Sequence, residues 1–351
     1  MESTSLTDKV QELDELELAA LVCLIANQHC IVDADTSAAL HDVEQKLQSA
    51  ASDTFELSCA VVDCNEKLTV EDFSNAILTD SRDEDESIHP SGPDEPSYFS
   101  REPGRIRSSR TSRFNTRPGA SLLDSRRVAD IVIAKNLNVA HHHVQIQALE
   151  LIRGKRIFTR TAVHAAPKRF LFIALICSNE GGPLLDHLND QFCLSHPYST
   201  ADHANDVSTP YTPGGLKGTN AVQIQTQDVD YLQTLASEVR ITAEVRGYLH
   251  NILTFLRAHR AVAGGISATA TRHLNVLVRA LAPLHALTFV PPSLVALAVR
   301  KVYSHRLLLV APEDERSLQW GSDVEAVKEL LEGLTVEDVI EDVLKTVEVP
   351  L

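Results

Sequence analysis

Residues 15–78 alternate between helical and extended hydrophobic patterns. Apolar residues recur at helical spacing in "ELELAALVCLIANQ", and the apolar run "HCIVDAD" has the length of a strand and ends in turn formers. The amphipathic segment "TSAALHDVEQKLQSAA" then predicts a helix that Thr36 or Ser37 caps.

A second strand and helix follow this first pair. "LSCAVVDC" predicts the strand, and "TVEDFSNAIL" predicts the helix, with Thr69 and Asp72 placed as in a capping box. A strand-helix-strand order requires a crossover between the strands, which predicts a parallel sheet with right-handed connections.

The same alternation continues after residue 121, where "ADIVIA" and "LFIALICS" predict buried strands. Between them, "HHHVQIQALELIRGK" predicts a helix and "RIFTRTAVHAAPKRF" a β-hairpin.

From about Gln227 onward the apolar period is 3.6 residues, which predicts helices. Two acidic helices complete the chain, one capped by Ser322 with Glu325 and the other by Thr335 with Asp338. The three helical segments before them are "EVRGYLHNILTFLRAHR", "SATATRHLNVLVRALAPLHAL" and "PPSLVALAVRKVYSHRL".

These patterns predict an α/β domain with two long insertions, followed by an all-helical domain. Both insertions are rich in Pro, Ser, Gly and charged residues and have little to bury, which is typical of disorder. The expected boundaries are residues 1–78 and 122–195 for the α/β domain, 79–121 and 196–226 for the two loops, 227–312 for the helical domain and 313–351 for the acidic helices.

Charge is distributed unevenly along the 351 residues. The net charge, 32 − 48 = −16, argues against a protein whose whole surface binds nucleic acid. Residues 100–119, "SREPGRIRSSRTSRFNTRPG", nevertheless carry six arginines against one acid. A charged linker is the simplest interpretation of this segment. The alternatives are binding of an acidic partner or nucleic acid, phosphorylation of its serines, and contact with the acidic C-terminal helices.

The same sequence also indicates where in the cell the protein is located. The longest apolar runs are too short to span a bilayer, and the N-terminus lacks the features of a signal peptide. The six cysteines show no CxxC spacing, which favours buried, reduced thiols. We therefore expect a cytoplasmic or nuclear protein that is neither secreted nor membrane-bound.

The helical end of the chain resembles the AAA+ ATPases, in particular the branch of MoxR and the magnesium-chelatase ATPase subunit. "GGISATATRHLNVLVRALAPLHALTFVPPSLVALA" is similar to the lid of that branch, and "HRL" follows as it does there. The segment "VQIQALELIRGKRIFTRTAVHAAPKRFLFIAL" is also similar to a group of fungal proteins named after magnesium chelatase.

The middle of the chain extends this resemblance to about two thirds of its length. It implies an α/β fold, with a degenerate P-loop AAA+ core (a parallel sheet with flanking helices) followed by an all-α lid. The residues that coincide with the family pattern are Asn138, Ala140, Val144, Gln145 and Glu150.

The positions that serve ATP in the family carry other residues here. A Walker A loop needs glycines, so that backbone N–H groups can cradle phosphates, and a Lys followed by Ser or Thr. The corresponding segment "DADTSAALHDVEQ" has no glycine, and Asp33, Asp35 and Ser37 lie in this degenerate Walker A region. Lys135 and Asn136 replace the two Walker B acids.

The remaining positions implied by the resemblance have changed as well. The sensor-1 asparagine aligns with Cys177, although Asn179 follows two residues later. The interface arginine aligns with Gln191, and the sensor-2 arginine aligns with Thr269, one helical turn before Arg272. Asn179 and Arg272 are thus the sensor-like candidates.

Loss of the lysine and of two or three cradle N–H groups removes on the order of 5 kcal/mol of phosphate binding, more than a thousandfold in affinity. We therefore expect a pseudo-ATPase without catalytic residues, cofactor or metal, which acts through a protein partner or self-assembly. The alternative is a magnesium-chelatase-like ATPase that binds ATP and Mg²⁺ at an atypical site.

Two features allow competing interpretations. Lys135 is expected to be solvated or to pair with Asp33 or Asp35, although it could bind a phosphate as a point charge. His141, His142 and His143 fit an exposed first helical turn better than a metal site, because adjacent helical side chains point in different directions.

Overall fold

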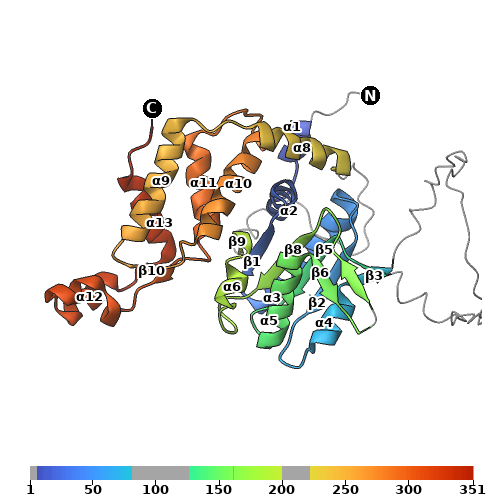
Figure 1. Ribbon diagram of the computed structural model, residues 1–351, viewed down its shortest axis with the longest axis horizontal. Helices are drawn as coiled ribbons and strands as arrows, with labels where there is room; N and C mark the ends of the chain where they lie inside the picture. Colours follow the sequence, from blue (N-terminus) through green and yellow to red (C-terminus); the bar gives the residue numbers. More distant parts are fainter. Residues whose placement is uncertain (1–5, 81–125, 161, 200–221, 351) are drawn as a thin grey trace, which may run out of the picture.

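The computed structural model describes residues 6–80, 126–160, 162–199 and 222–350. An α/β core and a helical C-terminal part lie side by side along the long axis of the molecule (Figure 1). Among the described residues, no helix has the length and apolar character that crossing a membrane would require.

The core is built on a sheet of five parallel strands in the order β2-β5-β8-β1-β9. The central strands β5 and β8 are apolar and buried almost throughout, as parallel strands are when helices cover both faces. The predicted parallel sheet is therefore confirmed. Its strands are β1 (His29–Ala34), β2 (Cys59–Asp63), β5 (Ile131–Lys135), β8 (Leu171–Ile176) and β9 (Phe192–Tyr198).

Strand β9 was not predicted, and its last three residues lie in the segment 196–226 that was expected to be a loop. Ser195, His196 and Pro197 give it a loop-like composition, but helices packed against the strand bury Ser195 and His196. Pro197 is tolerated because β9 is an edge strand that pairs with β1 alone in the described sheet.

Short helices and hairpins surround the sheet. Thr36 caps α3, and Thr69 caps α4 by accepting the Asp72 N–H at 3.2 Å. The predicted hairpin is confirmed as the antiparallel pair β6 and β7. The elements of this region are α1 (Leu6–Gln11), α2 (Glu15–Ala26), α3 (Ser37–Ser49), η1 (Ala50–Thr54), α4 (Val70–Ala76), α5 (His142–Gly154), β6 (Arg156–Phe158), β7 (Val163–Ala165) and α6 (Asp186–Asn189).

Strand β3 (Leu78–Asp80) pairs with β4 (Arg126–Val128), so the first insertion begins two residues later than expected. The rest of the first predicted loop, residues 81–121, lies outside the described residues, as do residues 200–221 of the second loop. Residues 222–226 of the second loop are described: Ile224 is buried, and α8 begins at Thr226.

The C-terminal part is helical, as the 3.6-residue period predicted. One predicted cap was wrong: α12 begins after Asp323, not Ser322, because the Asp323 carboxylate accepts the Glu325 N–H at 3.4 Å. The capping box of Thr335 and Asp338 is confirmed. The elements are α8 (Thr226–Glu238), α9 (Ala243–Ala258), β10 (Val262–Gly264), α10 (Ala268–Leu284), α11 (Pro292–Tyr303), β11 (Leu308–Leu309), η2 (Pro312–Asp314), η3 (Arg316–Trp320), α12 (Val324–Leu331) and α13 (Val336–Thr346).

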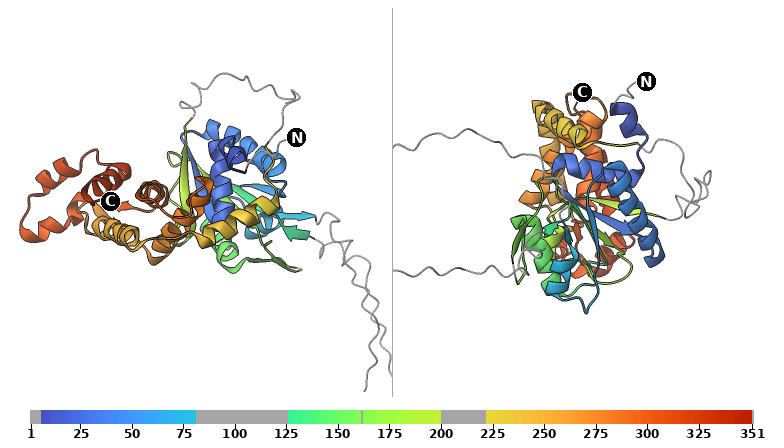
Figure 2. Two further views of the ribbon diagram at one scale, coloured as in Figure 1. Left: turned by 90° about the horizontal axis from the view of Figure 1, so that it is seen from above. Right: turned by 90° about the vertical axis from the view of Figure 1, so that its right-hand side faces the viewer.

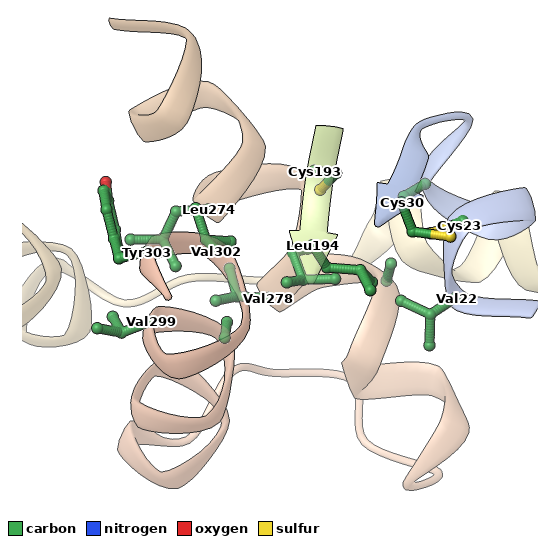
Figure 3. Close-up of a cluster of buried hydrophobic side chains, with 14 of the residues drawn as sticks. Val22, Cys23, Cys30, Cys193, Leu194, Leu274, Val278, Val299, Val302 and Tyr303 are labelled. Atoms are coloured by element: carbon green, nitrogen blue, oxygen red, sulfur yellow. The ribbon is translucent and has the colours of Figure 1, made fainter. Parts of the chain in front are cut away.

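The core and the helical part share one apolar interior. Figure 3 shows Val22 and Cys23 of α2 on one side of Leu194 in β9, with Val278 of α10 and Val299 of α11 on the other. The boundary between the parts is therefore a packed interface, with no solvent-filled hinge among these residues.

A buried arginine lies within this interface. Arg306 donates hydrogen bonds to the carbonyl oxygens of Asp190, Phe192 and Cys193 at the start of β9. It also donates to His273 Nδ1 on α10 at 2.8 Å, and its Nε lies 3.4 Å from the Asp190 carboxylate. The guanidinium thus ties the start of β9 and the turn before it to α10 and to the turn that follows α11.

Replacing Arg306 with alanine should lower the free energy of unfolding by about 3–5 kcal/mol, because buried carbonyls lose their donor and the Asp190 carboxylate loses its positive partner. Urea denaturation followed by circular dichroism measures the change. Arg272→Ala, an exposed position on the same helix as His273, is the control and should change stability by less than about 0.5 kcal/mol. Equal losses in the two variants would contradict this role of Arg306.

Buried histidines should make stability depend on pH. Burial lowers the pKa of His29 to about 3, and the positive charge of Lys155 acts in the same direction. For His273, burial and then the positive charge of Arg306 lower the pKa to about 3 as well. The unfolded chain, with histidine pKa values near ~6.5, binds more protons below that pH, so stability falls as pH decreases from ~6.5 toward 3. His29→Gln should reduce the slope of unfolding free energy against pH by up to ~1.4 kcal/mol per pH unit; an unchanged slope would contradict the assignment.

Candidate functional site

The candidate site lies at the carboxyl ends of the parallel strands, here called the carboxyl edge of the sheet, where α/β proteins usually bind ligands. β1 and β8 are neighbours, yet the chain leaves β1 toward β2 at one side of the sheet and leaves β8 toward β9 at the other. The carboxyl ends of two such strands form a switch point, the usual ligand-binding position in open α/β sheets. The candidate Walker A and Walker B residues all lie along this edge.

The connection from β1 to α3 is short. β1 ends at Ala34 and α3 begins at Ser37, so Asp35 and Thr36 alone join them. The Asp35 N–H donates to the Tyr198 carbonyl at 3.2 Å, and the Thr36 hydroxyl accepts the Ala39 N–H at 3.3 Å. This connection has neither the length nor the glycines of a loop that wraps phosphates with successive N–H groups.

Asp33 and Asp35 are both tied to the end of β8. The Asp33 carboxylate accepts hydrogen bonds from the N–H of Ser178, at 2.9 Å, and from its hydroxyl. The Asn179 amide donates to the Asp35 carbonyl at 3.0 Å. Asn179, the sensor-like candidate, thus holds the β1–α3 connection in place.

Lys135 pairs with Glu44 of α3, with 2.9 Å between Nζ and Oε2. The expected pairing with Asp33 or Asp35 is therefore wrong. The physical reason is the strand order: β8 lies between β5 and β1, whereas α3 contacts β5 directly. Both side chains are mostly buried, with 19% and 18% of their surface exposed.

Asn136 has a left-handed backbone, with φ of 55°, that turns the chain out of β5. Its N–H donates to the Leu175 carbonyl at 2.8 Å, and its side-chain amide donates to Asp63 Oδ1 at 3.2 Å. The two Walker B positions are thus engaged within the protein, one by an ion pair and the other by hydrogen bonds.

Arg272 does not join this group. It is exposed on α10, and the carbonyl of its neighbour His273 accepts from Cys193 Sγ at 3.9 Å, near the start of β9. Asp33 pairs with Pro197, four residues farther along that strand, which corresponds to about 13 Å. The sensor-like Arg272 therefore lies toward the amino ends of the strands, away from the carboxyl ends that hold Asp33.

The other aligned positions are also separated from the edge or buried. Cys177 is buried at the end of β8, while Gln191 precedes β9 at its amino end. Thr269 lies in the first turn of α10, beyond Ser267, whose hydroxyl donates to Asp190 at 2.6 Å. Neither Gln191 nor Thr269 is near the carboxyl edge that holds Asp33.

The histidine triplet forms a helix start, as expected. His141 is the N-cap of α5, its Nδ1 accepts the His143 N–H at 3.4 Å, and all three rings are exposed. Across the described part of the chain, no three His, Cys, Asp or Glu side chains gather in a group that could hold a metal ion.

Several residues of the edge were missed by sequence reasoning, namely Glu44, Asp63, Ser178 and Tyr198. A partial signal existed for Ser178, because it directly follows a buried strand and precedes the candidate Asn179. For Glu44 none existed, since its partner depends on how α3 crosses the sheet.

Comparison with known proteins shows the fold. No family model matches the chain. The crystal structure of a proposed ATPase from Cytophaga hutchinsonii superimposes with a TM-score of 0.68 and covers 99% of this chain and 94% of that chain at 14% identity. This likeness confirms the expected fold class, an α/β core with a parallel sheet followed by a helical region.

Two further proteins are similar over less of their length. An MCM homolog from Methanopyrus kandleri has a TM-score of 0.44 at 13% identity and covers 87% of this chain and 59% of that chain. "Maintenance of telomere capping protein 2" of Lachancea thermotolerans is 29% identical over 119 residues, which make up 32% of this chain and 42% of that protein. The match thus spans less than half of that relative.

The hydrogen bonds of Asp33 should contribute to stability. Asp33→Ala removes a carboxylate that accepts two hydrogen bonds and should lower the free energy of unfolding by about 1.5–3 kcal/mol. Asp35→Ala, at the exposed neighbouring position, should change it by less than about 0.5 kcal/mol. Urea denaturation of both variants tests this; a stabilised Asp33→Ala would instead indicate a strained functional carboxylate.

Proposed function

We propose that this chain is a AAA+-derived protein of the MoxR and magnesium-chelatase type that does not hydrolyse ATP and acts through protein–protein assembly, in the cytoplasm or nucleus. The observation that carries the proposal is the two-residue connection between β1 and α3. A phosphate cradle requires a loop at this position, and Asp35 and Thr36 cannot form one.

The negative charges at the carboxyl edge of the sheet also disfavour nucleotide binding. A triphosphate beside α3 would lie next to the carboxylates of Asp33 and Asp35 without the lysine that normally balances its charge. Lys135 cannot move there without breaking its 2.9 Å ion pair and leaving the largely buried Glu44 uncompensated. Such a loss costs several kcal/mol, comparable to the whole gain from one phosphate contact.

Magnesium would meet similar obstacles. Mg²⁺ binds through carboxylate, phosphate and water oxygens in octahedral geometry. At the two Walker B positions the chain offers an ammonium group and an amide, and the amide nitrogen of Asn136 donates to Asp63. At these two positions the amide oxygen of Asn136 is thus the one oxygen ligand, in place of the two carboxylates that normally serve Mg²⁺.

Without nucleotide hydrolysis, the intact fold can still serve in protein–protein assembly. AAA+ modules pack the core of one subunit against the lid of the next, and here Arg306 and the shared apolar interior hold the two parts in a fixed relation. A fixed relation preorganises both contact surfaces, which reduces the entropy that association costs.

Calorimetric titration of the purified chain with Mg-ATP tests the proposal. We expect no saturable heat up to millimolar nucleotide, because more than a thousandfold of phosphate affinity is missing. Lys135→Ala and Arg272→Ala serve as controls for an atypical site. Micromolar binding that either substitution abolishes would overturn the proposal in favour of an ATP- and Mg²⁺-dependent magnesium-chelatase-like ATPase.

A further inference from the structure

Residues 312–334, here called the helical arm, extend from the end of the C-terminal part (Figures 1 and 2). The arm consists of η2, η3 and α12. α12 buries Val327 and leaves the rest of its surface partly or fully exposed. Trp320 is 88% exposed and Leu330 51% exposed, so the arm carries large apolar side chains on its surface.

The base of the arm is held firmly. Glu315 is buried, and its carboxylate accepts hydrogen bonds from the N–H of Ser317, at 2.9 Å, and from its hydroxyl. The same carboxylate lies 3.6 Å from Nε of Arg260. Gly321, with φ of 89°, then turns the chain toward α12. The exposure of the arm is therefore a property of an ordered structure.

A cleft of about 800 Å³ lies between the arm and β11. Apolar side chains line part of it, and a row of carboxylates from the arm lines the rest. Lys328 is also present, but its ammonium is paired with Glu325 at 3.1 Å. The apolar residues are Leu309, Val310, Leu331 and Leu334, and the acids are Asp323, Glu325, Glu329 and Glu332.

An apolar cleft with an acidic rim fits an extended cationic peptide with apolar anchors. Residues 100–119 of this chain have that composition, with six arginines against one acid and with Ile106 and Phe114 among them. We infer that the cleft binds residues 100–119 of a second copy of this chain. The inference deepens the assembly proposed above and rests on it.

Geometry favours a second copy over the same chain. The basic segment leaves and rejoins the described structure at β3 and β4, at the opposite end of the long axis from α12 (Figure 1). Arg117 is 126 − 117 = 9 residues from Arg126, a span of at most about 30 Å. A compact chain of this length is roughly 40–50 Å across, so the segment cannot fill its own cleft along its whole length.

Such a contact joins two different surfaces, the basic segment of one copy and the helical arm of the next. Head-to-tail contacts of this kind generate rings when the rotation closes and open filaments when it does not. The charges on both sides also predict an association that weakens as salt increases.

The test uses the full chain with its six tract arginines replaced by serine, so that the cleft is free. Fluorescence anisotropy of a dye-labelled synthetic peptide with the sequence of residues 100–119 measures binding to this chain. We expect saturable binding in the micromolar range at about 0.15 M salt. Glu329→Lys in the same background should weaken binding about tenfold.

Two controls separate the cleft from general charge attraction. Glu348→Lys makes the same charge change at an exposed acid outside the cleft and should alter affinity less than twofold. A peptide carrying Ile106→Ser and Phe114→Ser keeps every arginine and should bind at least tenfold more weakly than the native peptide.

Equal weakening by Glu329→Lys and Glu348→Lys, or equal binding of the two peptides, would overturn the inference. So would tighter binding of the peptide to a 20-nucleotide RNA than to the chain. Failure of this titration leaves the Mg-ATP result unchanged, and Mg-ATP binding would refute the proposed function without altering the anisotropy of the labelled peptide.

Discussion

Inside the contact between the sheet and the C-terminal helices lies the guanidinium of Arg306. Burial lowers its pKa from the ordinary value, and the Asp190 carboxylate acts in the opposite direction. A charge in such a place is tolerated only when its donors are matched by acceptors, and here backbone carbonyls at the start of β9 supply most of them. Because those carbonyls belong to an edge strand, the position of the helical part depends on the same contacts that hold the sheet edge.

At the carboxyl edge of the sheet, polar and charged side chains are likewise paired with other groups of the protein. Asp33 is satisfied by Ser178, Lys135 by Glu44 and Asn136 by Asp63. These contacts connect β1, β2, β5 and β8 with one another and with α3, which makes the carboxyl ends of the strands part of the structural framework.

Local patterns in the sequence were enough for most of the fold, since long apolar runs and helix caps depend on neighbours in the chain. They failed at β9, because α10 and α11, which cover it, lie more than seventy residues later. They failed at Lys135 for a related reason: its partner depends on strand order and on the path of α3. The residue types at the candidate Walker positions could be judged from the sequence alone, whereas the distance of Arg272 from those positions required the packing of the helical part.

The tight β1–α3 connection has a consequence for how the molecule can be controlled. In switching proteins, a ligand shifts the balance between two conformations only as far as it binds one of them better. The β1–α3 connection is two residues long and is held at both ends by hydrogen bonds. A segment held in this way offers a ligand little difference between two conformations, so under the proposed function changes in association come from protein concentration, salt or covalent modification.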